Sequence, residues 1–173
     1  MRSKYRPEID GLRAFAIFSV VLNHLNQDIL PNGFLGVDIF FVISGYLITS
    51  SIYRVNKTNF ISFLTDFYLR RIRRIYPALI AFSIISGLII SLFELEPTLS
   101  LRTGISSLLG LSNVYLLKQS TDYFSEVTDL NIFAHTWSLG IEIQFYLIFP
   151  FLIWCSGYFK NRQNNKNIFY LII

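Results

Sequence analysis

The chain has 173 residues and is 53% hydrophobic, 17% aromatic and only 15% charged, with a mean hydropathy of +0.47. Soluble domains carry about a quarter charged residues, so this composition excludes an ordinary water-soluble globular protein. The net charge of +4 is modest, and the basic residues gather at the ends of apolar segments, which indicates a lipid bilayer as partner and argues against nucleic acid. The single cysteine, Cys155, excludes a disulfide framework, and the two histidines are too scattered for a metal site.

Two apolar segments, residues 12–30 and 34–53, are predicted to be the first two membrane-spanning helices. Each has about the 20 residues that a helix needs to cross the hydrocarbon layer. A polar turn at residues 31–33 separates them. The basic residues before the first segment resemble the start of a signal peptide, but no small-residue cleavage site follows, so we interpret the segment as a retained helix.

A basic connector, residues 54–76, leads to a third predicted span at residues 75–93. Apolar side chains in the connector recur at the spacing of a helix that lies along a membrane surface. These side chains are Phe60, Phe63, Leu64 and Phe67. The connector ends in four arginines, which are Arg70, Arg71, Arg73 and Arg74.

The rest of the chain contains one weak and one strong apolar segment. Residues 101–117 carry glycines and serines, residues 137–158 are strongly apolar, and residues 167–173 resemble the opening of a further span. The predicted fold class is therefore all-α, a polytopic transmembrane helical bundle with four to five spans. We expect residues 1–173 to be the N-terminal part of one longer membrane domain.

The distribution of Lys and Arg predicts a cytoplasmic N-terminus for a multi-pass protein of the inner membrane. The N-terminal tail and the connector at residues 54–76 are both basic, and two predicted spans separate them. The basic segment 160–166 is also expected in the cytoplasm. That placement requires residues 101–117 either not to cross the membrane completely or to form a re-entrant hairpin, so the topology of residues 101–134 stays open.

Arg13 and His24 are ionisable residues within the first predicted span, where such residues are rare and usually functional or paired. Their separation of eleven residues is about 20° past three helical turns, so they share one face, about 16 Å apart along the axis. A histidine at that depth suits proton transfer. The alternative is a side chain at a helix end that reaches the outer surface.

Asp38 begins the second predicted span and should lie at its outer end, within reach of His24. Such a carboxylate could orient the imidazole and favour its protonated form. The alternative is an acid stabilised by the positive end of its own helix dipole.

Glu142 lies about one turn inside an apolar helix whose N-cap is predicted to be Thr136 or Ser138. Tyr146 is four residues further on and shares its face, and Gln144 lies between them. We favour the lining of a polar cavity over a lipid-facing surface for these three polar groups.

The arginine cluster at residues 70–74 has two interpretations. Basic residues beside a span commonly bind anionic lipid headgroups and set the topology. Guanidinium groups also suit bidentate contacts to phosphates, so the cluster is a candidate site for a donor that carries several phosphates.

Four motifs, in this order, resemble the N-terminal part of the acyltransferase-3 family, which includes O-acetylases of O-antigen, peptidoglycan and nodulation factors. They are RPEIDGLRAFAIFSVVLNH at residues 6–24, GFLGVDIFFVISGYLI at 33–48, FYLRRIRRIYPAL at 67–79 and HTWSLGIEIQFYLIFP at 135–150. The resemblance implies a helical membrane domain of about ten spans, roughly half of which the remainder of the same chain would supply.

The resemblance also implies O-acetylation or a related acyl transfer. The donor would be a cytoplasmic acyl-CoA, commonly acetyl-CoA, which acts as co-substrate with no bound cofactor. The acceptor would be a hydroxyl of a cell-surface or lipid-linked glycan, as in the modification of lipopolysaccharide or another polysaccharide.

Residue by residue, Arg13 and His24 fit the family's motif of an arginine and a histidine separated by ten residues. Glu142 fits the acid of its Trp-Ser-Leu motif, although Ile143 stands where the family often has a second acid. The candidate catalytic residues are therefore His24 and Glu142, which fit these motifs, and Asp38, which is expected within reach of His24.

The arginines fit the family's Arg-x-x-Arg element, which is associated with the donor. Arg71 pairs with Arg74 in one register, and Arg70 pairs with Arg73 in the other. All four, together with Arg13, are candidate donor-binding residues.

We hypothesise that His24 is the general base on the acceptor hydroxyl and that Asp38 or Glu142 holds its tautomer. A relay through an acyl-histidine is the second option. The predicted supporting residues are Asp10, Ser138 and Tyr146.

Two other classes of function compete with a transferase. A transporter or channel would explain buried charges at His24 and Glu142, and it predicts solute flux that does not depend on CoA. A non-catalytic sensor or anchor domain would use the polar residues for helix association, and it predicts tolerance to substitution at His24.

Overall fold

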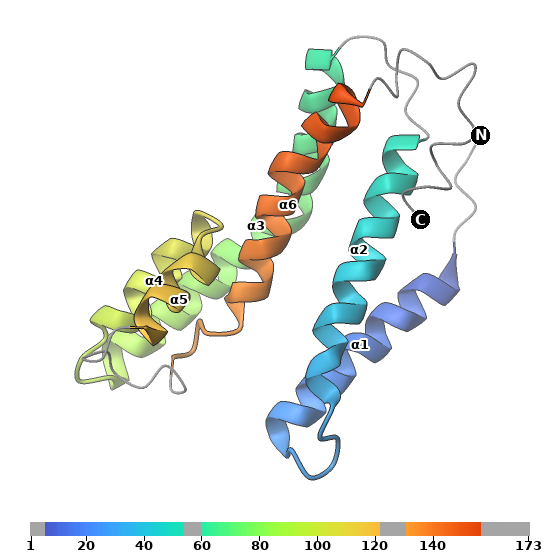
Figure 1. The fold of residues 1–173 in the computed structure, drawn as a ribbon. Helices are drawn as coiled ribbons and strands as arrows, with labels where there is room; N and C mark the ends of the chain where they lie inside the picture. Colours follow the sequence, from blue (N-terminus) through green and yellow to red (C-terminus); the bar gives the residue numbers. More distant parts are fainter. Residues whose placement is uncertain (1–5, 54–59, 122–130, 157–173) are drawn as a thin grey trace. The chain divides into compact units, whose positions relative to one another are not determined.

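The computed structural model of the protein describes residues 6–53, 60–121 and 131–156, and all regular structure in them is helical (Figure 1). The predicted all-α fold class is therefore confirmed. The chain forms two compact units, one of Met1–Asn56 with Asn167–Ile173 and one of Lys57–Lys166. The predicted cytoplasmic segment at residues 160–166 and the further span predicted at 167–173 lie outside the described residues.

The first unit is a helical hairpin. Its elements are helix α1, Pro7–Leu25, the short 3-10 turn η1, Gly33–Leu35, and helix α2, Gly36–Tyr53 (Figure 1). Proline suits the first position of α1, because the N–H that it lacks would have no partner inside the helix. The second predicted span is confirmed as η1 and α2. The first helix begins and ends five residues before the predicted range of 12–30.

The two helices of the hairpin approach each other closely near the turn that joins them. A Cβ atom on Gly36 would lie 2.3 Å from the backbone oxygen of Ala16, and one on Gly33 would lie 2.3 Å from that of Ser19. Ala16 and Ser19 are both buried. Small residues on both helices therefore let the two backbones meet, as at helix crossings in membranes.

Three helical stretches of the described chain are long and apolar enough to cross a membrane, which are Gly33–Ile52, Phe60–Phe93 and Thr136–Cys155. Helix α1 is not one of them, because Glu8, Asp10 and Arg13 occupy its first two turns. Twelve residues of α1 follow, nine of them apolar. They make about 18 Å of helix against a hydrocarbon layer of about 30 Å. The predicted count of four to five spans is therefore not confirmed.

The second unit contains four helices, which are α3, Phe60–Phe93, α4, Thr98–Leu108, α5, Ser112–Ser120, and α6, Thr136–Cys155. The third predicted span, residues 75–93, lies within the 34-residue helix α3, which also runs without a break through the predicted surface helix. No glycine or proline breaks residues 60–76, and Pro77 lies inside the helix. Apolar helices tolerate such a proline where neighbouring groups satisfy the freed carbonyl.

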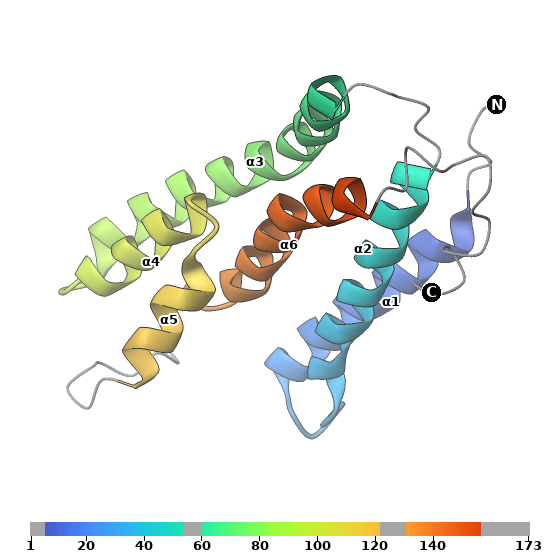
Figure 2. The same ribbon diagram turned by 45° about the horizontal axis from the view of Figure 1, so that its top comes forward.

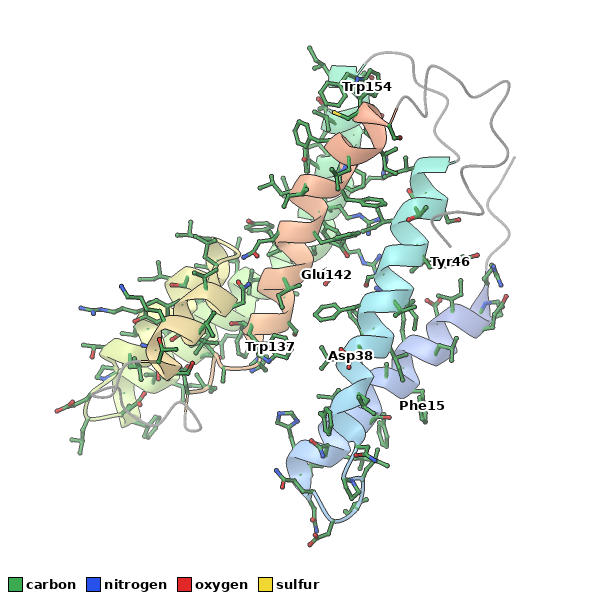
Figure 3. All side chains as sticks on the ribbon, viewed as in Figure 1. Phe15, Asp38, Tyr46, Trp137, Glu142 and Trp154 are labelled. Carbon is green, nitrogen blue, oxygen red and sulfur yellow. The ribbon has the colours of Figure 1, made fainter. Side chains whose placement is uncertain are left out.

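Helix α6 runs antiparallel beside α3 (Figures 1 and 2). At one end, the ring of Trp154, which is labelled in Figure 3, lies 4.6 Å from that of Phe60, the first residue of α3. Further along, the hydroxyl of Tyr68 donates a hydrogen bond of 3.0 Å to the backbone oxygen of Leu147. Long aromatic side chains therefore join the two helices.

The weak apolar segment at residues 101–117 is not a continuous span. It is interrupted between α4 and α5 at Gly110, whose φ of 70° lies in the left-handed region that favours glycine. The two helices are about 16 and 14 Å long, so neither crosses a hydrocarbon layer by itself. A Cβ on Gly140 of α6 would lie 2.9 Å from Oδ1 of Asn113, so α5 packs closely on α6.

The close contact in the first unit predicts opposite effects for the same substitution at two glycines of α2. Gly36→Ala should lower the melting temperature of the protein in detergent, because its Cβ would overlap the Ala16 carbonyl and cost about 1–3 kcal/mol. Gly45→Ala is the matched control, since a Cβ there meets nothing within 4 Å and alanine favours a helix by roughly 0.5–1 kcal/mol. Equal melting temperatures for the two variants would contradict this packing.

Candidate functional site

In the first unit, α1 is continuous from Arg13 to His24, so the two side chains share one helical face. Arg13 is half-buried, and its guanidinium carbon lies 5.1 Å from the centre of the Phe40 ring on α2. A cation at this distance from an aromatic face is attracted by it. The continuous helix therefore holds Arg13 against α2 and places the exposed His24 at the other end of α1.

The imidazole of His24 is oriented by its own helix. Its Nδ1 lies 2.9 Å from the backbone oxygen of Val20. A carbonyl oxygen can only accept a hydrogen bond, so Nδ1 carries a proton in this contact. In the neutral ring, Nε2 is then the nitrogen with the free electron pair, which is the form that a general base needs.

Asn23, which the sequence analysis did not select, supports the turn beside His24. Its side-chain nitrogen is buried and donates hydrogen bonds to the backbone oxygens of Leu30, at 2.9 Å, and Pro31, at 3.2 Å. A polar amide one residue before the histidine, close to the end of an apolar helix, was the available signal. Its hydrogen bonds fix the chain that connects α1 to α2.

The two candidate acids of the first unit, Asp38 and Asp10, lie near helix starts. Asp38 is exposed in the first turn of α2, where the positive end of the helix dipole stabilises a carboxylate. Asp10 is exposed in α1. Among residues 6–53, no hydrogen bond or ion pair joins Asp38 to His24. The orienting role of Asp38 therefore stays a prediction.

Arg6, another residue that sequence reasoning missed, links the start of α1 to α2. Its Nη1 donates a hydrogen bond of 2.7 Å to the hydroxyl of Tyr46, and its Nε pairs with Glu8 at 2.8 Å. The hydrogen bond from Arg6 lowers the pKa of the Glu8 carboxyl below its usual value. The contact between Arg6 and Tyr46 therefore joins the two helices of the hairpin at the end opposite to the turn.

In the second unit, Glu142, Tyr146 and Arg71 come together between α3 and α6. Glu142 and Tyr146 are buried, and the tyrosine hydroxyl donates a hydrogen bond to the glutamate carboxylate. The guanidinium carbon of Arg71 lies 5.0 Å from the centre of the Tyr146 ring. The predicted shared face of Glu142 and Tyr146 is confirmed, and the contact with Arg71 was not predicted.

The other arginines of the cluster have a different environment. Arg70, Arg73 and Arg74 are exposed, within an arc of about 100° of the α3 surface. No carboxylate of the described chain forms an ion pair with any of the three. They therefore present uncompensated positive charge to an anion.

Gln144 and Ser138 do not have the places that the sequence predicted for them. The Gln144 side-chain nitrogen donates to Oδ1 of Asn113, at 2.8 Å, and to the backbone oxygen of Gly110, at 2.9 Å. It lies about 200° around the helix from Glu142, so the two do not line one surface. The predicted N-cap is wrong, because His135 has that position and Ser138 donates its hydroxyl to the His135 carbonyl. No group of three metal-ligating side chains lies together in the described parts of the chain.

Comparison with known proteins identifies the chain's relatives. Residues 6–173 match the model of the acyltransferase-3 family, described as an acyltransferase domain. The chain is 41% identical over 170 residues to the O-acetyltransferase OatA of Staphylococcus aureus strain NCTC 8325 / PS 47, and the proteins of strains COL and N315 match equally. The alignment covers 95% of this chain and 27% of each relative. No solved structure matches.

The chain spans about a quarter of the length of the relatives that it matches. Within that part, the family match runs from the residue before α1 to the last residue of the chain. The chain therefore belongs to the acyltransferase-3 family.

Proposed function

We propose that this chain is part of an integral-membrane O-acyltransferase, specifically an O-acetyltransferase, that acylates a hydroxyl of a cell-surface or lipid-linked glycan. The observation that carries the proposal is the family match over residues 6–173, together with relatives named O-acetyltransferase that align with 95% of the chain. The acyl donor in this proposal is a cytoplasmic acyl-CoA, with acetyl-CoA as the first candidate.

The length of α3 supports a membrane position for the arginine cluster. Its apolar part, residues 75–93, is about 28 Å long, close to the roughly 30 Å of a hydrocarbon layer. The arginines at residues 70–74 directly precede it and would lie at one membrane surface. The excess of Lys and Arg before α3 and before α1 favours the cytoplasmic face of the inner membrane for both ends.

The exposed arginines suit the recognition of the donor. CoA carries several phosphates, and guanidinium groups bind phosphate oxygens through paired charge-assisted hydrogen bonds. Arg70, Arg73 and Arg74 are exposed and have no carboxylate partner among the described residues, so binding a phosphate would not require breaking an ion pair. Arg13 stays a candidate of the first unit.

His24 is the proposed general base. Its Nε2 would take the proton of the acceptor hydroxyl while the acceptor oxygen attacks the thioester carbonyl. The new C–O bond then forms, the C–S bond breaks, and the CoA thiolate leaves and is protonated by the imidazolium. The Val20 carbonyl supports this role, because it holds the tautomer that leaves Nε2 free. Asp38 and Glu142 are candidates for binding the acceptor or stabilising charge.

Replacing His24 by asparagine separates base chemistry from structure. The side-chain nitrogen of asparagine can reproduce the Nδ1 hydrogen bond to Val20, but it has no nitrogen that accepts a proton at neutral pH. His24→Asn and His24→Ala should both lower acyl transfer by about 100-fold or more, measured as acyl groups on the glycan by mass spectrometry. Normal transfer by His24→Asn, at equal amounts of protein in the membrane, would exclude the general base.

The exposed arginine face predicts a change in donor affinity. Arg73→Gln should raise the KM for acetyl-CoA by about tenfold, because a charge-assisted hydrogen bond to a phosphate contributes roughly 1.5–3 kcal/mol. The matched control is Arg102→Gln, which removes an exposed guanidinium from α4 in the same unit and should leave the KM unchanged. If both variants keep the parent KM, the cluster serves the anionic lipid surface and not the donor.

A further inference from the structure

Arg71 differs from its three neighbours in what it contacts. Its guanidinium carbon lies 5.6 Å from the centre of the Phe67 ring on α3 and 5.0 Å from that of Tyr146 on α6. The side chain is half-buried, whereas Arg70, Arg73 and Arg74 are exposed. A half-buried guanidinium over two aromatic rings is less available to an anion than an exposed one.

The contact between Arg71 and Tyr146 belongs to the joint between α3 and α6. One turn before Arg71, the Tyr68 hydroxyl donates to the backbone oxygen of Leu147, the residue after Tyr146. Further back, the rings of Phe63 and Trp154 are 6.4 Å apart. Arg71 therefore continues a row of contacts from α3 to α6.

Tyr146 connects this joint to the buried acid. Its ring lies beside Arg71, and its hydroxyl donates to the carboxylate of Glu142 one turn earlier on α6. A buried carboxylate needs hydrogen bonds and a nearby positive charge to stay ionised. Arg71 is therefore linked to the Glu142 carboxylate through the ring and hydroxyl of Tyr146.

We infer that Arg71 is a positioning residue, which holds Tyr146 and through it the Glu142 carboxylate, while Arg70, Arg73 and Arg74 face the phosphates of the donor. The inference rests on the proposed function and deepens it, since it divides the four arginines between two tasks. The inference also favours one register of the Arg-x-x-Arg element. Arg70 and Arg73 are both exposed, whereas Arg71 is half-buried beside Tyr146 and Arg74 is exposed.

The first test is independent of activity. Arg71→Gln, Tyr146→Leu and the double variant of the full-length protein are purified in detergent, and their melting temperatures are compared. Residues in direct contact show non-additive effects, so the double variant should lose clearly less than the sum of the two single losses. Arg74→Gln with Tyr146→Leu is the matched control and should be additive. Additive losses for both pairs would overturn the contact.

The second test separates positioning from donor binding. Arg71→Gln should lower kcat by about 10- to 100-fold, since displaced reacting groups cost that much, and should leave the KM for acetyl-CoA within about twofold. Tyr146→Phe keeps the ring beside Arg71 and removes the hydroxyl, so it should lower kcat in the same way. An Arg71→Gln variant with a raised KM and the parent kcat would make Arg71 a donor ligand and overturn the inference.

Two further outcomes keep the tests decisive. If Arg71→Gln does not accumulate in the membrane, Arg71→Lys replaces it as the test variant. Lysine keeps the positive charge but lacks the planar guanidinium group. A parent-like kcat for Arg71→Lys would show that charge alone suffices, and it would contradict positioning through the contact of the guanidinium with the Tyr146 ring. If the parent protein itself transfers no acyl group, the proposed function fails, whereas the melting temperatures still decide whether Arg71 holds Tyr146.

Discussion

A polar side chain on an apolar helix has to find its hydrogen-bond partner within the protein, because hydrocarbon offers none. This constraint accounts for the contacts of several buried polar residues in both units. Tyr146 donates to Glu142, Gln144 donates to Asn113 and the Gly110 carbonyl, and Asn23 donates to the turn after α1. The bonds of Gln144 fix α6 to α5 and those of Asn23 fix a turn, so polar groups that need partners also determine how helices pack.

Glycine residues allow neighbouring helices to approach each other closely in both units. Gly33 and Gly36 bring the turn and α2 against the backbone of α1, and Gly140 brings α6 against α5. Between α3 and α6, by contrast, aromatic side chains make the contacts. The first unit therefore holds His24 on a tightly packed hairpin, and the second holds Glu142 and the arginines on helices joined by side chains.

The sequence predicted those features that depend on composition and on ideal helical geometry. These include the all-α class, the second span, the shared face of Arg13 and His24 and that of Glu142 and Tyr146. It did not predict the environment of Arg71. Extended from Phe63 and Phe67 at 100° per residue, the buried face of α3 points to Arg74, about 20° from both, and not to Arg71. The buried face turns around α3 toward Leu79, which only the packed structure reveals. The partners of Gln144 likewise depend on contacts between residues far apart in the sequence, which no local pattern encodes.

The central claim is that the protein moves an acyl group from CoA to a glycan. The most direct measurement supplies isotopically labelled acetyl-CoA to the cytoplasmic face of membrane vesicles and follows the label into surface or lipid-linked glycan by mass spectrometry. The account predicts an alkali-labile labelled ester on the glycan in vesicles that contain the full-length protein, and none in vesicles from a strain without its gene. Equal labelling of the glycan in both kinds of vesicle, or none in either, would contradict it.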